Sequence, residues 1–201
     1  MHHLVRLVVL SLAFATLAQG QQAPVAPVRV RGTVQAFDGQ TLTLATPKDG
    51  VVKLAVGTNT GINGVAAKKV ADIGDNTFIG TTAVKDAKGR WQATEVHIFP
   101  EAMRGAGEGH YAWDLPESTM TNAAVTGAVR KGRSGTFSLK YAGGAVDVSV
   151  TRKTAIVALT AGDRSLLVPG AAVFALAVPQ TGGAPNAVAI VAETNGVKPP
   201  M

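Results

Sequence analysis

The chain has 201 residues, no cysteine, and 19 Lys and Arg against 13 Asp and Glu, which gives a formal net charge of +6. Disulfides and thiolate metal sites are therefore excluded, and stability must come from the apolar area that a chain of this length can bury. Basic residues occur in scattered pairs such as Lys68-Lys69 and Arg152-Lys153, which we interpret as solvated turn residues, and aromatic residues are few, so nucleic-acid binding is not expected.

The N-terminus has the pattern of an export signal. Arg6 gives a basic start, Leu4–Leu17 is almost continuously apolar, and Ala18-Gln19-Gly20 places small residues where a signal peptidase reads them. We therefore expect residues 1–20 to be a cleaved signal peptide. The apolar run is too short for a stable membrane span, and no cysteine is present to carry a lipid anchor. The prediction is a periplasmic or secreted protein that does not span the membrane.

The segment from Val28 to Phe99 has the pattern of short strands separated by tight turns. Apolar and polar residues alternate from Val28 to Ala36, which is the period of a half-buried strand. Asp38-Gly39 and Asp49-Gly50 each predict a hairpin, because glycine accepts the positive φ that such turns need. The other strand-like runs contain Leu42 and Leu44, Val52–Val56, Thr77–Val84 and Trp91–Phe99, and a looser stretch covers Gly57–Asp75.

The second half repeats the first. At a spacing of 95 residues, Gly32-Thr-Val34 matches Gly127-Ala-Val129, and Thr41-Leu-Thr-Leu44 matches Thr136-Phe-Ser-Leu139. At a spacing of 94, Gly50–Val56 matches Gly144–Val150, Thr60 and Ile62 match Thr154 and Ile156, and Ala93 and Val96 match Ala187 and Ile190. In between, Ile73 and Phe78 align with Val168 and Val173. This regular spacing indicates an internal duplication.

Each copy contains five strand-like runs. A five-stranded Greek-key barrel of the OB type has this strand count, and closing the sheet removes its exposed edges. We therefore predict an all-β protein of two tandem OB-like five-stranded barrels formed by internal duplication. The barrels are expected at residues 28–99 and 123–195, with a connector at 100–122. A small SH3-like barrel or a β-sandwich fits the same periodicity.

The glycine and strand positions resemble a family of bacterial exported domains that are often duplicated and whose function is uncharacterised. The pattern is G-x-V, then D-G-x-T-L-T-L, L-x-V, T-x-I and V-x-I, and it covers residues 28–99 more fully than 124–193. Because these positions are glycines and strand residues, the resemblance implies a fold and no particular chemistry.

The densest set of functional side chains lies between the two copies, from His97 to Asn122. Pro100 and Pro116 interrupt regular structure there, and a loop this long between compact barrels favours a functional role. The candidate metal ligands are His97, Met103, His110 and Met120. The candidate shielding or docking residues are Tyr111, Trp113, Glu101 and Glu108.

Copper is the metal that these candidate ligands favour. Thioether with imidazole suits Cu(I), and imidazole with carboxylate suits Cu(II) or zinc. The residue types resemble those of small periplasmic copper and silver chaperones, OB-type barrels that bind Cu(I) through Met and His beside a Trp. In those proteins the ligands lie on barrel strands, whereas here they lie mostly on a connector. The alternative is a structural connector whose Met and aromatic side chains fill the groove between the barrels.

His97 shares a strand face with Glu95 and stands where the second copy has Val191, which we interpret as surface variation. No nucleophile and base have the spacing of a catalytic site, so no catalytic residue and no enzyme is predicted. The expected function is non-enzymatic binding. The partner is either a metal ion, with Cu(I) or Cu(II) as the candidate cofactor, or a cell-envelope protein or polymer.

Overall fold

The computed structural model describes residues 26–200, so the expected signal peptide at residues 1–20 lies outside the described part of the chain. The described residues are all-β, as predicted, with short 3₁₀ turns (η) as the only helical elements. The strands are β1 (Val28–Phe37), β2 (Thr41–Thr46), β3 (Gly50–Ala67), β4 (Phe78–Lys85), β5 (Trp91–Ile98), β6 (Gly109–Ala112), β7 (Thr119–Lys131), β8 (Ser134–Tyr141), β9 (Gly144–Val150), β10 (Ala155–Ala161), β11 (Ala172–Gln180) and β12 (Gly183–Ala192). The 3₁₀ turns are η1 (Val70–Asp72), η2 (Glu101–Met103) and η3 (Arg164–Leu166). Over residues 26–200, no helix has the length and apolar character needed to cross a bilayer.

The predicted hairpins form for the expected physical reasons. Leu42 and Leu44 are fully buried while the threonines between and beside them are partly exposed, so β2 has one apolar face. At the β1–β2 turn, the Asp38 carboxylate accepts hydrogen bonds from the backbone N–H groups of Gln40 and Thr41 at 2.8 and 2.6 Å. Gly39 follows with a φ of 95°, which a side chain would disfavour.

Five strands close into a barrel around the first hydrophobic core. β1 pairs with β2 and β11, β2 pairs with β3, and β12 closes the ring by pairing with both β3 and β11. All of these pairings are antiparallel except β3 with β12, which is parallel. The enclosed core includes Leu42, Leu44, Leu54 and Ile190, each fully buried. We call this barrel the first ring.

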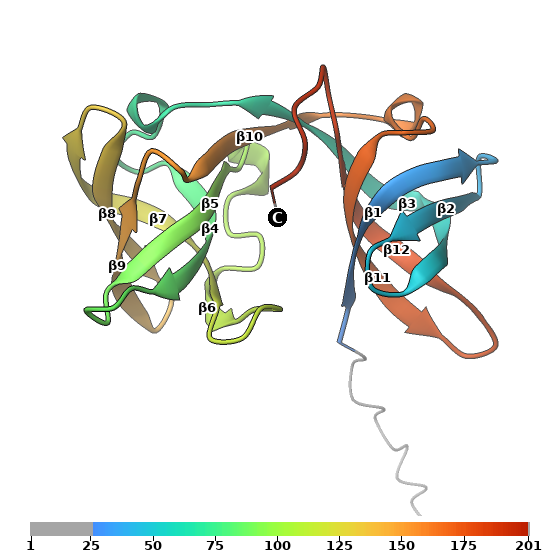
Figure 1. Ribbon diagram of the computed structural model, residues 1–201, viewed down its shortest axis with the longest axis horizontal. Helices are drawn as coiled ribbons and strands as arrows, with labels where there is room; N and C mark the ends of the chain where they lie inside the picture. The colour runs from blue at the N-terminus through green and yellow to red at the C-terminus, as the bar shows by residue number, and fades with distance from the viewer. Residues whose placement is uncertain (1–25, 201) are drawn as a thin grey trace, which may run out of the picture.

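A second set of five strands has the same pairing order. β7 pairs with β8 and β4, β8 with β9, and β5 with β4 and, in parallel over two residue pairs, with β9. The core inside includes Ile73, Ala123, Phe137 and Leu139, all with 1% exposure or less. We call this set the second ring. The two rings form the two lobes seen side by side in Figure 1.

The prediction of two tandem barrels, each made by one half of the chain, is not confirmed. The first ring takes β1–β3 from the first half and β11–β12 from the second, and the second ring takes β4–β5 from the first half and β7–β9 from the second. The ranges 28–99 and 123–195 are therefore sequence repeats, and the two halves exchange their last two strands. The connector is also shorter than expected, because β7 begins at Thr119.

The exchange takes place where β3 crosses from one lobe to the other. Beyond Val56, β3 continues to Ala67 and pairs antiparallel with β10 (Figure 1). In this ladder Val65 pairs with Leu159, which is its own repeat equivalent 94 residues later. The same shift of 94 residues converts the neighbouring pair Gly64–Thr160 into the pair Ala66–Ala158. A pseudo-twofold axis therefore passes through the Val65–Leu159 pair.

The pairing register corrects three positions of the repeat alignment. Val34 and Val125 both precede a β-bulge and pair with the equivalent Leu44 and Leu139, so Val125 is the counterpart of Val34. Val129, which the sequence comparison had matched to Val34, is 75% exposed. The β7–β8 hairpin is longer than β1–β2, and this shifts the match. Likewise, Ile73 follows η1 and Leu167 follows the equivalent turn η3, so Leu167 and not Val168 is the counterpart of Ile73. The backbone oxygens of Phe78 and Ala172 accept hydrogen bonds from the equivalent residues Phe99 and Glu193, so Ala172 and not Val173 is the counterpart of Phe78.

Candidate functional site

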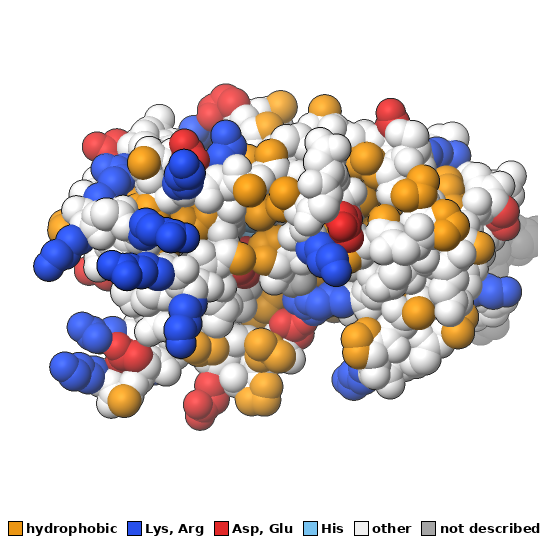
Figure 2. Space-filling model, turned by 45° about the horizontal axis from the view of Figure 1, so that its top comes forward, with side chains coloured by type: hydrophobic (Ala, Val, Ile, Leu, Met, Phe, Trp, Pro, Cys, Tyr) orange, Lys and Arg blue, Asp and Glu red, His pale blue; other side chains and the backbone are white. Residues whose placement is uncertain are grey.

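A cavity of about 250 Å³ lies between the two rings, beside the pseudo-twofold axis. Figure 2 shows hydrophobic side chains gathered in the hollow between the lobes. The first ring supplies Phe174, Leu176, Ala189 and Val191, the second ring supplies His97, Met120 and Asn122, the crossing strands supply Asn63 and Leu159, and the segment after β5 supplies Phe99, Met103, Ala106, Gly107, Tyr111 and Trp113.

The segment 99–118 is held against both rings and forms one wall of this cavity. On the second ring, β6 pairs with β7, and the Glu108 carboxylate accepts a hydrogen bond from the backbone N–H of Ala142 at 2.8 Å. On the first ring, the Arg29 guanidinium lies 3.7 Å from the centroid of the Trp113 ring, and Arg31 is ion-paired with Asp114. The connector therefore joins the two lobes as well as covering the space between them.

The two faces that meet at the cavity have diverged. The pairs Gly80–His97 on β4–β5 and Phe174–Val191 on β11–β12 are equivalent in register, and so are Thr82–Glu95 and Leu176–Ala189. The first ring thus presents Phe174, Leu176, Ala189 and Val191, whereas the second ring has Gly80, Thr82, Glu95 and His97 at the same positions. The first ring is therefore apolar at these four positions, whereas the second ring has polar residues or glycine, and His97 with the nearby Asn122 brings polar groups to the cavity.

Glu95 and His97 form a buried pair on β5, with 3% and 4% exposure. Oε1 of Glu95 accepts hydrogen bonds from the backbone N–H of Thr82 at 3.0 Å and from its hydroxyl at 2.8 Å. Oε2 lies 3.2 Å from Nδ1 of His97. Because a carboxylate accepts, Nδ1 is the donor in this contact, and Nε2 of His97 is the ring nitrogen that is not bonded to Glu95. The interpretation of His97 as surface variation is wrong, although its shared face with Glu95 is confirmed.

Gly80 lets the His97 ring and Asn122 approach each other. A Cβ atom at position 80 would lie 2.0 Å from Nε2 of His97 and 2.5 Å from Oδ1 of Asn122, far inside contact distance. Only glycine leaves room for both polar atoms at this point, so Nε2 and Oδ1 are close neighbours. The absence of a side chain at Gly80 therefore shapes the polar wall.

Two buried polar atoms of cavity-lining residues have no hydrogen-bond partner, Oδ1 of Asn122 and Nε1 of Trp113. The amide of Asn122 is held by its other end, because Nδ2 donates to the backbone oxygen of Ala106 at 3.1 Å. Asn122 is 7% exposed, so its free acceptor is a cost to the fold unless a ligand or water satisfies it. The lining residues thus offer one unpartnered acceptor, Oδ1 of Asn122, and one unpartnered indole donor, with Nε2 of His97 close to the Asn122 oxygen.

The predicted metal ligands fall into two groups. His97, Met103 and Met120 line the cavity, together with Tyr111 and Trp113. His110 does not; its ring stacks on Tyr141 with a centroid distance of 5.9 Å, meets Trp91 edge-on at 5.5 Å, and its Nδ1 lies 2.8 Å from the Thr121 hydroxyl. Burial lowers the pKa of His110 below its ordinary value of 6.5.

The two predicted carboxylates of the connector have other partners. Glu101 forms a two-point ion pair with Arg104, with contacts of 2.5 and 2.7 Å, and this guanidinium lowers the pKa of Glu101. Glu108 is engaged with the β8–β9 turn as described above. Neither lines the cavity. Within residues 26–200 no three His, Asp or Glu side chains form a cluster that could hold a metal ion.

Sequence reasoning missed Asn122 and Glu95 as members of the site. Both are adjacent to predicted residues, but nothing in their spacing shows that they become buried. The available signal is the repeat comparison, because Glu95 and His97 fall on Ala189 and Val191 of the second copy. A pair of polar residues replacing an apolar pair on one strand face is informative once both positions are known to be buried.

Scans of protein-family models, of curated proteins and of solved structures found no match to this chain. The resemblance to exported duplicated domains thus remains a resemblance.

Proposed function

We propose that this protein is a non-enzymatic binding protein whose ligand occupies the cavity between the two rings. The observation that carries the proposal is the combination of an apolar cavity of about 250 Å³ with the unpartnered Oδ1 of Asn122 and Nε1 of Trp113. Ligand pockets are commonly apolar with a few polar groups that orient the ligand. Unsatisfied buried polar groups at such a place gain stability when a ligand supplies the missing hydrogen bonds.

The lining defines the chemical class of the ligand. Phe99, Phe174, Leu176 and Val191 accept an apolar or aromatic body. The Oδ1 atom of Asn122 requires a donor, and the indole N–H of Trp113 requires an acceptor. A small aromatic or aliphatic molecule with one hydroxyl or amide group meets all of these requirements.

A soft metal ion is the second candidate. Nδ1 of His97 is oriented by Glu95, and a carboxylate behind the imidazole is the usual second partner of a metal-ligating histidine. Met103 and Met120 line the same cavity and supply the thioether groups that Cu(I) prefers. The copper hypothesis thus continues with His97, Met103 and Met120, and without His110.

We further propose that both rings are OB-type barrels that have exchanged strands. In each ring the order is first, second, third, fifth, fourth strand, with the third and fifth parallel, if β12 and β5 are counted as fifth strands. That order is the arrangement of the OB barrel. The signal-like residues 1–20 support export to the periplasm or beyond the cell, where the ligand would be met.

Two aromatic probes test the organic-ligand proposal. We expect the mature chain, residues 21–201, to bind 2-naphthol, which both donates and accepts a hydrogen bond. Naphthalene, which lacks the hydroxyl, should bind about fivefold more weakly, because one neutral hydrogen bond in a buried site is worth about 1 kcal/mol. Equal affinity for the two probes, or no binding of either, would reject the polar recognition that we propose.

A volume-matched double variant separates the two candidates. Met103→Leu/Met120→Leu preserves the apolar lining, so 2-naphthol binding should remain, but it removes both thioethers and should abolish tight Cu(I) binding in an anaerobic competition titration. His110→Gln is the matched control, because His110 lies outside the cavity. If neither probe nor copper binds, the connector is structural, and the alternative of an envelope protein or polymer docking module takes precedence.

A further inference from the structure

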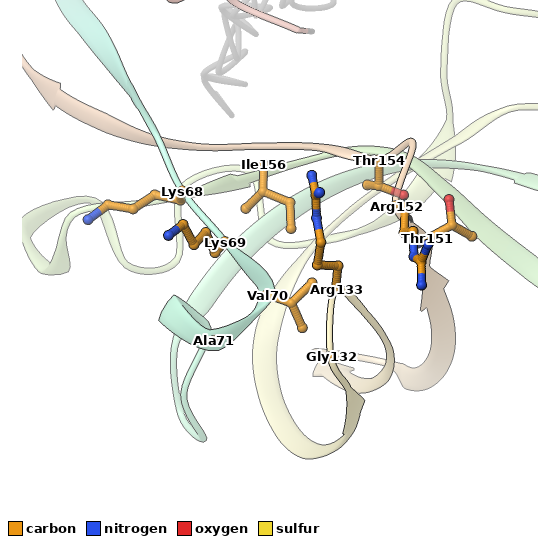
Figure 3. A pocket seen from close by; sticks show the side chains of 10 residues that line it. All are labelled: Lys68, Lys69, Val70, Ala71, Gly132, Arg133, Thr151, Arg152, Thr154 and Ile156. Carbon is orange, nitrogen blue, oxygen red and sulfur yellow. Dashed lines mark hydrogen bonds between the residues drawn. The ribbon is translucent and has the colours of Figure 1, made fainter.

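A second, chemically different hollow lies on the second ring, away from the cavity between the lobes. It has a volume of about 520 Å³ and is bordered by η1, the β7–β8 hairpin, and the loop between β9 and β10. Figure 3 shows Arg133 rising beside Ile156, with Arg152 near Thr151 and Thr154, and with Lys68 and Lys69 on the other side. We call this hollow the basic groove. Figure 2 shows that Lys and Arg side chains gather on one lobe.

The four cations of the basic groove are Lys68, Lys69, Arg133 and Arg152, and all four are exposed. Within residues 26–200, each of the four lacks an ion-pair partner. Asp72 is close in sequence, but its carboxylate accepts a hydrogen bond from the backbone N–H of Lys69 at 2.7 Å. Four cations without an ion-pair partner, beside the single carboxylate of Asp72, leave a net positive potential around the hollow that attracts anions.

The pseudo-twofold axis provides an internal comparison. In the first ring the equivalent hollow is occupied by Arg164, whose guanidinium donates to the backbone oxygens of Gly39 at 2.9 Å and Gly57 at 2.8 Å. Arg164 therefore joins its own turn η3 to the β1–β2 hairpin and to β3. Its counterpart in the second ring is Val70, which is too short to do this. The basic groove is open because the second ring has Val70, and no arginine, at the position equivalent to Arg164.

The cations themselves are also specific to the second ring. Counting 94 residues along, Lys68 and Lys69 correspond to Gly162 and Asp163, and Arg152 corresponds to Thr58. Arg133 lies in the part of the β7–β8 hairpin that extends beyond its β1–β2 counterpart. Positions that are neutral or acidic around the first ring are thus basic around the second, and three separate segments contribute. The interpretation of these pairs as solvated turn residues agrees with their exposure, and the fold in addition brings Lys68, Lys69 and Arg152 to one hollow.

We propose that the basic groove binds the phosphate groups of a multiply phosphorylated ligand. Two guanidinium groups offer the paired donors that match phosphate oxygens, and two lysines add positive charge on flexible side chains that can adjust to the ligand. The Thr154 hydroxyl donates to the backbone oxygen of Ala93 at 2.9 Å, and the Thr151 hydroxyl accepts from the backbone N–H of Lys153 at 3.2 Å, so recognition relies mainly on the four charged side chains. A single phosphate would leave part of this charge unmatched, which favours an oligophosphate or a headgroup with more than one phosphate.

Calorimetric titration of the mature chain with tripolyphosphate tests this proposal, and flotation with phosphatidylcholine vesicles with and without cardiolipin tests the lipid source. We expect binding in at least one arm and a decrease in affinity as salt concentration rises. In Arg133→Gln/Arg152→Gln the affinity should fall at least about tenfold, because two charge-assisted contacts are lost. Binding only to tripolyphosphate identifies a soluble phosphorylated ligand, and binding only to cardiolipin vesicles identifies a lipid headgroup.

The matched control is Lys48→Gln/Lys53→Gln, which removes the same net charge from exposed positions of the first ring. It should change the affinity by less than about twofold, because charges farther away than a Debye length are screened. Equal losses in the two double variants would show that the attraction is a property of net charge alone and would overturn the proposal. Absence of binding in both arms would overturn it as well.

Discussion

Gly80 is the residue on which the polar wall of the cavity depends most directly. The space that a side chain would occupy is filled by the His97 ring and the Asn122 amide. Glu95 and Thr82 then hold His97 in place from the opposite side. Hydrogen bonds through Glu95 thus fix the His97 ring, and a hydrogen bond to the backbone of Ala106 fixes the Asn122 amide. Gly80 allows the two groups to lie next to each other.

Gly80→Ala should destabilise the protein by about 1–3 kcal/mol, because the added methyl group forces the His97 ring or the Asn122 amide to move. The same change should weaken 2-naphthol binding. Urea unfolding gives the stability, and Gly127→Ala is the control, since its Cβ would meet Ser138 at an ordinary 3.8 Å. If both alanines behave alike, Gly80 has no special role.

His110 should make stability depend on pH. Burial lowers its pKa in the folded protein, so the unfolded chain binds a proton more readily. This contribution to stability is complete above the unfolded value of 6.5 and is lost as pH falls through the lowered folded pKa. Urea unfolding between about pH 7 and about pH 5 should show the loss.

His110→Phe keeps an aromatic ring between Trp91 and Tyr141 but cannot titrate. Its unfolding free energy should therefore vary less with pH over this range than that of the natural chain. An unchanged pH dependence in the variant would assign the effect to other groups.

At the scale of elements, β3 determines the architecture. Sequence patterns predicted most strands and their hairpins, because alternation and Asp-Gly turns act locally, and they also revealed the duplication. They did not predict that β3 continues through Gly57–Ala67, since Gly57, Gly61 and Gly64 make this stretch look irregular. Gly64 is required there by packing, because a Cβ would lie 2.4 Å from the Thr194 hydroxyl oxygen.

The exchange of strands was not predictable from local patterns for a related reason. β4 and β11 have equivalent positions in the repeat, as do β5 and β12, so either copy satisfies the pairing pattern of either ring. Which copy completes which ring depends on the lobe to which β3 carries the chain. The candidate site was predicted in part, because Met103, Met120, Tyr111 and Trp113 are apolar residues of an inter-lobe segment, but burial of Glu95 and Asn122 depends on the exchange.

The isolated first half, residues 21–99, tests the role of the crossing strand. Because β3 carries the chain away from the first ring, we expect this fragment to form a homodimer in which two β3 strands pair around Val65, as β3 and β10 do in the whole chain. Light scattering after gel filtration gives the mass. Val65→Arg should prevent dimerisation, since two charges would meet on the axis. A folded monomer would show that the strands close on themselves and that exchange is not imposed by β3.

At the scale of the whole molecule, the two lobes are related by a pseudo-twofold axis but have become different surfaces. The cavity combines an apolar wall of the first ring with a polar wall of the second, and the basic groove exists only on the second ring. A symmetric dimer of a single copy would have two identical faces at each of these places. Duplication within one chain allows the copies to diverge, and the two proposed sites both lie where they have done so.

The most direct test of the binding proposal is an NMR titration of the mature chain with 2-naphthol. The sequence contains two tryptophans, Trp113, which lines the cavity, and Trp91, which contacts His110 and does not line it. We expect the indole N–H signal of Trp113 and the side-chain amide signals of Asn122 to shift in a saturable way, while the indole signal of Trp91 stays in place. Shifts of both indoles, or of neither, would contradict a ligand site in the cavity between the rings.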